Sequence, residues 1–93
     1  MFKRVHVYYS GRVQGVGFRF TVERIALDTN SLTGWVKNLT DDRVEVVAEG
    51  DEEKLNDFLR SISSGLMKRY IRREDIIWEE VVGDMDDFII KFY

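Results

Sequence analysis

The sequence contains no cysteine and only 1 histidine, and these absences exclude several kinds of chemistry. Without cysteine the chain can form no disulfide bond and has no thiol nucleophile. A structural zinc site is built mostly from cysteine and histidine ligands, which this composition does not supply. A chain free of cysteine also fits the reducing cytoplasm, where disulfides are rare.

The chain also lacks a surplus of basic residues and a long apolar run. Its 14 Lys and Arg are outnumbered by 17 Asp and Glu, for a net charge of −3, whereas nucleic-acid-binding domains usually carry a basic surplus. No segment approaches the roughly 18 apolar residues of a membrane span, and the N-terminus has no apolar signal-peptide core. We therefore expect a cytoplasmic protein with neither a nucleic-acid nor a membrane partner.

What the sequence does contain is enough apolar material for a core. Hydrophobic residues make up 44% of the 93 residues and aromatic residues 13%, which argues against disorder. The length corresponds to one domain, and no linker or repeat interrupts it. We expect a single domain over residues 1–93 and a monomer, although the exposed sheet face around Tyr8 could serve as a contact surface.

Hydrophobic periodicity predicts a mixture of strands and helices. Val5, Val7 and Tyr9 alternate with polar residues, as in a half-buried strand, and helical spacing begins at Phe18. The predicted elements are a strand over 4–10, a helix from 18 that ends near 30, a hairpin of strands 33–39 and 43–49 with its turn at 40–42, a helix that opens at 50–53 and ends at 63–65, an unassigned basic connector over 66–73, and strands over 76–82 and 88–92. This order predicts an α+β fold, the ferredoxin-like split βαβ sandwich (βαββαβ), with an antiparallel sheet, two helices on one face and a possible extra edge strand.

The most informative segment is the glycine-rich loop at 11–17, between the first predicted strand and helix. Glycine adopts backbone angles that let several N–H groups point inward, and such a concavity ahead of a helix N-terminus favours an anion. Arg19 adds a planar fork of donors that matches phosphate oxygens. The segment predicts a phosphate-sized anion held mostly by backbone. The plainer alternatives are an ordinary turn and an ion pair between Arg19 and Glu23.

Two motifs carry a resemblance to a known family. Gly-Arg-Val-Gln-Gly-Val-Gly-Phe-Arg at 11–19 resembles the signature loop of the acylphosphatases, and Gly-Trp-Val-Lys-Asn at 34–38, followed by Val44, Glu45 and Gly50, resembles their second signature. The resemblance implies hydrolysis of a small acyl phosphate to a carboxylate and inorganic phosphate, without metal or other cofactor. Phosphate or sulfate would bind as product or inhibitor.

The resemblance also implies roles for individual residues. Backbone amides of the loop and the Arg19 side chain would hold the phosphoryl group, and Asn38 on a neighbouring strand would orient the attacking water. Arg19 and Asn38 are thus the candidate catalytic residues. The candidate phosphate-binding residues are Val13, Gln14, Gly15, Val16, Gly17, Phe18 and Arg19.

The chain departs from the family's usual pattern at several positions. The hairpin turn has Asp42 where a glycine is common, so we expect the hairpin to form at some conformational cost. The first helix ends at Thr29-Asn30 rather than at a glycine. The connector after the second helix usually contains Gly-Pro, whereas this sequence has no proline, so its conformation cannot be carried over.

Other interpretations compete with the enzymatic one. A binding module could retain the phosphate-binding loop with little or no turnover, and RNA-recognition motifs share this order of elements. The third predicted strand has acids and no aromatic residue, which argues against base stacking. His6 is expected as a solvated side chain on the open sheet face. Ser10 is not expected to act as a nucleophile, because no histidine–carboxylate pair is in place to activate it.

Overall fold

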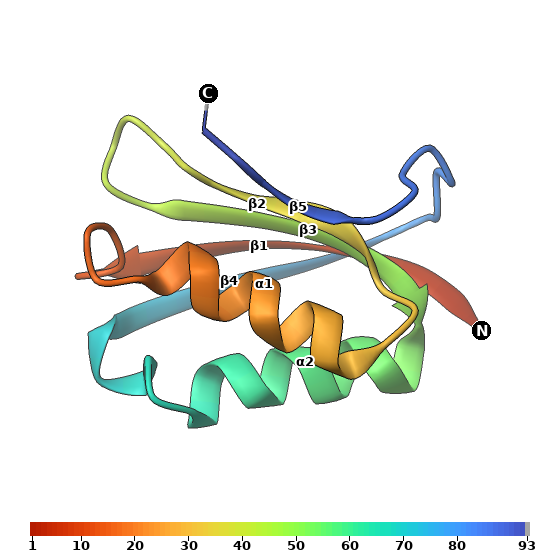
Figure 1. Ribbon diagram of the computed structural model, residues 1–93, viewed down its shortest axis with the longest axis horizontal. Coiled ribbons are helices and arrows are strands. Elements are labelled where there is room, and N and C mark those ends of the chain that lie inside the picture. The colour runs from red at the N-terminus through yellow and green to blue at the C-terminus, as the bar shows by residue number, and fades with distance from the viewer. Residues whose placement is uncertain (93) are drawn as a thin grey trace.

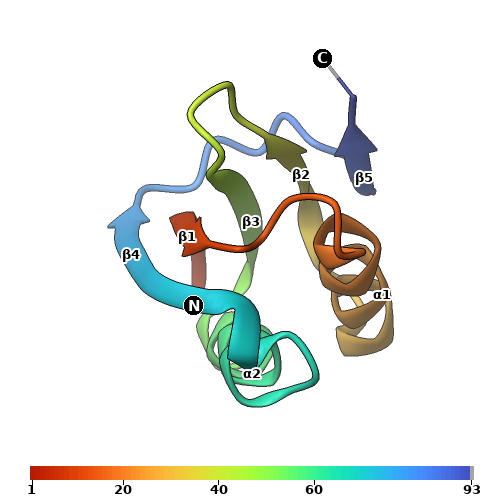
Figure 2. The ribbon, with the colours of Figure 1, turned by 90° about the vertical axis from the view of Figure 1, so that its left-hand side faces the viewer.

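Strands and helices follow one another in the predicted order in the computed structural model, which describes residues 1–92 (Figure 1). The elements are β1 (Phe2–Gly11), α1 (Phe18–Thr29), β2 (Thr33–Asn38), β3 (Val44–Asp51), α2 (Glu52–Ser64), the short 3-10 helix η1 (Lys68–Tyr70), β4 (Ile71–Glu79) and β5 (Phe88–Lys91). Both helices lie on the same face of the sheet, as Figures 1 and 2 show. The predicted split βαβ fold is confirmed.

The sheet has 5 strands in the order β4-β1-β3-β2-β5. Pairs β1–β3, β1–β4 and β2–β3 are antiparallel. The last strand, β5, adds to the outer edge of β2 in parallel, so the sheet is mixed rather than wholly antiparallel. The open question of an edge strand or a paired terminus is thereby answered, because β5 forms the second edge.

The hydrophobic core lies between the sheet and the helices. Val5, Val7 and Tyr9 are fully buried on β1, as their alternation predicts. The Tyr9 ring packs against Phe18 of α1 with 5.1 Å between ring centroids, and burial together with the nearby Glu74 carboxylate raises the pKa of Tyr9. Burial of a large apolar side chain such as Phe18 stabilises the fold by about 1.5–3 kcal/mol. The contribution of α2 to the core comes from Leu55, Phe58, Leu59 and Ile62.

The predicted bounds of β4 are wrong at both ends. The strand begins at Ile71 rather than 76 and ends at Glu79 rather than 82. Its first half, residues 71–75, is mostly charged, and it lies at the edge of the sheet with one edge open to solvent. Charged side chains are tolerated there. Because these residues lack apolar alternation, the sequence pattern did not predict this half of the strand.

The chain between β4 and β5 is held by one buried carboxylate. Glu49 of β3 is only 4% exposed, and it accepts hydrogen bonds from the backbone N–H groups of Val82 (2.8 Å) and Gly83 (3.0 Å) and from the Arg4 guanidinium (3.0 Å). Burial opposes the charged form of Glu49, but these donors outweigh burial and lower its pKa. Glu49 thereby supplies the hydrogen bonds that a sheet partner would otherwise provide to residues 82 and 83.

No helix within residues 1–92 is long and apolar enough to cross a membrane.

Candidate phosphate site at one end of the sheet

The predicted site residues gather at one end of the sheet. Strands β1, β2 and β5 run in the same direction, so their C-terminal ends meet there with the start of β3 and β4. The loop after β1, the β2–β3 hairpin and the connector before β4 lie at this end in Figure 1. Strand β3 lies between β1 and β2. The sequence had suggested that Asn38 lies on the strand next to β1. That prediction is wrong, because β3 separates β2, which carries Asn38, from β1.

Two glycines shape the loop. Gly15 and Gly17 have φ angles of 78° and 82°, in the left-handed region, while Val16 between them does not. Alternating backbone conformations of this kind turn successive N–H groups toward a common centre. A Cβ atom at Gly15 or Gly17 would meet no atom within 4 Å. Glycine is thus required here by backbone angle rather than by crowding.

The backbone donors of this loop, over residues 13–19, have no hydrogen-bond partner among residues 1–92. Within the described part of the chain, no carbonyl or side chain accepts a hydrogen bond from the backbone N–H of residues 13–19. Helix α1 begins directly after Gly17 with no side-chain cap and no acid in its first turn. Neither a side-chain cap nor an acid in the first turn of α1 compensates the positive end of its dipole, and the loop beside it presents donors that are unpaired within the described residues.

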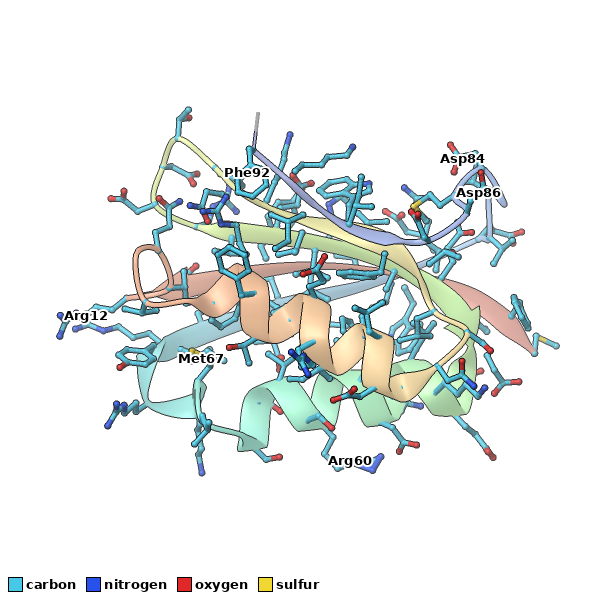
Figure 3. The ribbon with its side chains drawn as sticks, viewed as in Figure 1. Arg12, Arg60, Met67, Asp84, Asp86 and Phe92 are labelled. Atoms are coloured by element: carbon cyan, nitrogen blue, oxygen red, sulfur yellow. The ribbon has the colours of Figure 1, made fainter. Side chains whose placement is uncertain are left out.

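Arg19 lies in the first turn of α1, beside this loop. Its guanidinium stacks over the ring of Phe92, 5.0 Å from the ring centroid, and residues 1–92 contain no ion pair between Arg19 and Glu23. The plain surface-pair alternative is therefore not observed. No sequence pattern placed Phe92 at the site, and the only signal that could have done so is an aromatic residue at the end of the last predicted strand. Phe92 lies near the loop end of the molecule in Figure 3.

A side-chain amide connects the loop to the hairpin. Gln14 Nε2 donates to the carbonyl oxygens of Leu39 (2.8 Å) and Arg43 (2.9 Å), on the two sides of the hairpin turn. The loop is thus tied to the residue that follows Asn38. Both amide protons of Gln14 are donated in these two hydrogen bonds, so its side chain has no donor left for a ligand.

Asn38 ends β2 at the same end of the sheet. Its side-chain oxygen Oδ1 is buried and has no hydrogen-bond partner within the described residues. Buried polar atoms are rarely left unpaired in folded proteins, and those that are call for an explanation. An acceptor of this kind can hold a water molecule or a ligand donor.

The hairpin turn forms without glycine. Asp42 adopts a φ of 72°, the left-handed conformation that the sequence required of it. Asp41 accepts hydrogen bonds from the backbone N–H (3.3 Å) and the Nε (2.9 Å) of Arg43, and the Leu39 N–H donates to the Arg43 carbonyl at 2.8 Å. The turn is therefore closed by local hydrogen bonds, and Asp42 supplies the required backbone angle.

His6 is on the open sheet face, as predicted, but it is not freely solvated. Its Nε2 is hydrogen-bonded to the Glu45 carboxylate, its Nδ1 lies 3.5 Å from Glu79, and its ring stacks on Tyr8 at 4.8 Å. Only 20% of the side chain is exposed. Both ring nitrogens face carboxylates on this face of the sheet, so His6 is not placed to serve the loop as a base.

The connector that the sequence left unassigned packs against the loop. The Arg12 N–H donates to the Tyr70 carbonyl at 2.9 Å, and a Cβ at Gly11 would lie 2.3 Å from that same oxygen. Figure 3 shows Arg12 and Met67 at this end of the molecule. Basic residues of η1, Lys68 and Arg69, therefore lie close to the loop. No group of three or more His, Cys, Asp or Glu side chains within residues 1–92 is placed to hold a metal ion.

Comparisons with known proteins agree with this geometry. The acylphosphatase family model matches residues 5–90. An acylphosphatase of Geobacillus kaustophilus is 46% identical over 90 residues, covering 97% of this chain and 95% of its own length. The crystal structure of an acylphosphatase from Bacillus subtilis has a TM-score of 0.87 at 34% identity, covering 98% of this chain and 99% of its own. That from Coxiella burnetii has a TM-score of 0.79 at 36% identity, covering 97% and 93%.

Proposed function

This chain belongs to the acylphosphatase family and is an acyl-phosphate-hydrolysing enzyme, and we propose that the loop at 13–19 grips the phosphoryl group while Asn38 orients the water that attacks it. The observation that carries the proposal is the set of unpaired N–H groups over residues 13–19, beside the Arg19 guanidinium. An anion bound there would satisfy these donors. It would also interact favourably with the helix dipole.

The loop and Arg19 suit the charge of the substrate. The phosphoryl group of an acyl phosphate carries negative charge on its non-bridging oxygens, and this charge is redistributed in a loose transition state. Backbone donors that are already fixed in place stabilise such charge without reorganisation. Arg19 contributes a positively charged guanidinium, and its stacking on Phe92 restricts where that charge lies.

Asn38 suits the task of positioning water. Its unpaired Oδ1 would accept a hydrogen bond from a water molecule and hold it in line with the bond to be broken. The water oxygen forms a new bond to phosphorus as the bond from phosphorus to the acyl oxygen breaks. The bonding electrons leave with the carboxylate, and the water proton passes to solvent or to the phosphate product.

The reaction needs no general acid. A carboxylate is a stable leaving group, so protonation of the departing oxygen is not obligatory, and phosphoryl transfer depends mainly on positioning and charge stabilisation. The position of His6 between carboxylates on the open sheet face accords with a mechanism that uses no histidine. Inorganic phosphate and sulfate would occupy the same loop as product or inhibitor.

Benzoyl phosphate hydrolysis by purified protein in the presence of a chelator tests this function. We expect turnover without added metal, and Arg19→Ala should lower kcat/KM on the order of 100- to 1000-fold, the usual cost of one preorganised donor. Arg24→Ala removes an exposed arginine of the same helix and should leave the rate unchanged. Phosphate binding without turnover would instead identify a binding module.

A further inference from the structure

Thr21 contacts the backbone of the phosphate loop from within α1. Its hydroxyl Oγ1 donates a hydrogen bond to the Gly17 carbonyl oxygen at 3.0 Å. The Thr21 N–H donates to the same oxygen at 3.1 Å. A carbonyl oxygen has two lone pairs, so both hydrogen bonds can form together. The last carbonyl of the loop is thus held by two donors of one residue.

The Gly17 carbonyl belongs to the peptide unit that also carries the Phe18 N–H. A trans peptide is planar, with its C=O and N–H pointing in opposite directions. The Gly17 oxygen accepts from a residue four positions further along α1, so it points along the helix. The Phe18 N–H therefore points out of the helix N-terminus, toward the loop. A contact that fixes the Gly17 oxygen also fixes the direction of this donor.

The two sides of this peptide unit are restrained unequally. On one side the Phe18 ring is buried and packs against Tyr9, with 5.1 Å between ring centroids. On the other side Gly17 has no side chain, and a Cβ there would meet no atom within 4 Å. Glycine is the residue with the greatest backbone freedom, and α1 has no side-chain cap at its N-terminus. The Thr21 hydroxyl therefore restrains the unit where the backbone is least constrained.

The same hydrogen bond affects the strength of the donor. Hydrogen bonds that share a peptide unit polarise one another. Two donors on the Gly17 oxygen draw electron density from the peptide nitrogen and leave the Phe18 N–H more positive. Within the described residues this N–H has no acceptor, so a bound anion would receive the full effect.

We propose that Thr21 is a positioning residue for the phosphoryl group. Its hydroxyl orients and polarises the Gly17–Phe18 peptide unit, so that the Phe18 N–H is aimed at a phosphoryl oxygen. This role rests on the proposed function, because it requires that the loop bind the phosphoryl group. Thr21 acts through the backbone and does not itself touch the substrate.

Helix α1 supplies a matched control for this hydroxyl. Thr29, at the other end of the helix, makes the same kind of bond from its Oγ1 to the carbonyl oxygen of Ile25, four residues earlier, at 2.7 Å. Both threonines are half-buried. Thr21→Val and Thr29→Val each remove one such hydroxyl with little change of shape. Only Thr21→Val removes it beside the loop.

Phosphate titration followed by NMR of the backbone amides, together with benzoyl phosphate kinetics, tests this role. Thr21→Val should raise the phosphate dissociation constant about three- to tenfold, as expected for the loss of one hydrogen bond, and should lower kcat/KM by at least the same factor. The shift of the Phe18 amide resonance on phosphate binding should shrink in this variant. Thr21→Ser, which keeps the hydroxyl, and Thr29→Val should both stay within about twofold of wild type.

Several results would overturn the role of Thr21. An equal effect of Thr21→Val and Thr29→Val on phosphate binding would trace the loss to helix stability rather than to the loop. A Thr21→Ser variant as weak as Thr21→Val, or an unchanged shift of the Phe18 amide in Thr21→Val, would also contradict it. A wild type that binds phosphate without hydrolysing benzoyl phosphate would contradict the hydrolytic function alone, and the binding measurements would still decide the role of Thr21. A wild type that does not bind phosphate would overturn both.

Discussion

The contact between Arg19 and Phe92 shows how one side chain outside the loop can tune the phosphate site. The guanidinium lies 5.0 Å from the Phe92 ring centroid, and Phe92 itself is 71% exposed. Because a flexible arginine loses rotamer freedom when it binds an anion, a ring that already restricts it lowers the cost of binding. We therefore propose that Phe92 is a positioning residue that acts through Arg19.

Phe92→Leu should weaken phosphate binding with little effect on stability. A cation–π contact at an exposed site is worth about 0.5–1 kcal/mol, so the inhibition constant for phosphate should rise about two- to fivefold. Competitive inhibition of benzoyl phosphate hydrolysis measures it. Phe20→Leu, at an aromatic residue of α1 that is 60% exposed, is the matched control. An equal change in both variants would show that the ring contact has no special role.

Asp42 offers a test of backbone strain at the hairpin. Its φ of 72° costs an ordinary L-residue about 1–2 kcal/mol, and an aspartate somewhat less. Asp42→Gly should therefore raise the free energy of unfolding by about 0.5 kcal/mol, after the larger unfolded-state entropy of glycine is subtracted. That corresponds to about 2–4 °C in Tm by thermal denaturation.

The neighbouring residue supplies the control for this substitution. Asp41 has no positive φ and bonds to Arg43 through its carboxylate, so Asp41→Gly should lower Tm. If Asp42→Gly also lowered Tm, the turn would depend on the Asp42 side chain rather than on its backbone angle.

Sequence patterns predicted the backbone of the site better than its side-chain contacts. The left-handed glycines of the loop and the left-handed Asp42 followed from residue type, because few residues adopt these angles. The stacking of Phe92 on Arg19 joins residues far apart in the chain, and the unpaired Oδ1 of Asn38 results from how distant segments pack around it. No local pattern records such contacts, which depend on the final sheet order.

At the scale of elements, the contrast between local sequence pattern and long-range contact also distinguishes the helices from β4. Helix α2 has a single apolar stripe and an N-cap, Asp51, that accepts from the Glu53 N–H at 3.0 Å, so its bounds were predictable. Strand β4 is defined by its pairing with β1 rather than by its own alternation. The tie from Gln14 to both sides of the hairpin likewise exists only once β3 has placed β2 within reach of the loop.

Glu49 links the chain between β4 and β5 to the centre of the sheet. Its carboxylate should therefore make the free energy of unfolding depend on pH in the acid range. Its pKa is lower in the folded state than its usual value. A carboxylate whose pKa is lower in the folded state than in the unfolded state stabilises the fold. This stabilisation is fully present above the unfolded pKa, about 4.3 for glutamate, and it is lost as pH falls through the folded value.

Glu49→Gln should therefore change how stability depends on pH. The amide has one acceptor oxygen and leaves part of the donor set unpaired, so the variant should be less stable at pH 7. The gap between wild type and variant should narrow as the pH falls below about 4.3. Urea unfolding at several pH values measures this difference, and a gap that stayed constant to low pH would show that the Glu49 charge does not act this way.

At the scale of the whole molecule, charge is distributed unevenly along the sheet. The net charge is −3, yet basic residues of the loop and connector, Arg12, Lys68 and Arg69, lie at the end that holds the candidate site. Figure 3 shows Asp84 and Asp86 at the other end. A net acidic protein can therefore present a locally positive approach to an anionic substrate.

The site as a whole is assembled from strand ends rather than from one motif. β1 leads into the loop, β2 ends in Asn38, and β5 leads into Phe92, and parallel directions bring these ends together. The sheet also keeps the loop and Asn38 at a fixed separation, with β3 between their strands. We propose that the loop binds the anion by itself and that hydrolysis depends on Asn38 being held within reach of it.

The most direct test of this division of labour is the Asn38→Ala variant, with kcat and the phosphate inhibition constant measured on the same preparation. We predict that kcat falls on the order of 100-fold or more, while the phosphate inhibition constant stays within about threefold of wild type, since the loop and Arg19 are unchanged. Asn56→Ala, at an exposed asparagine of α2, should alter neither quantity. An Asn38→Ala enzyme with undiminished kcat would contradict the role of Asn38 in positioning water.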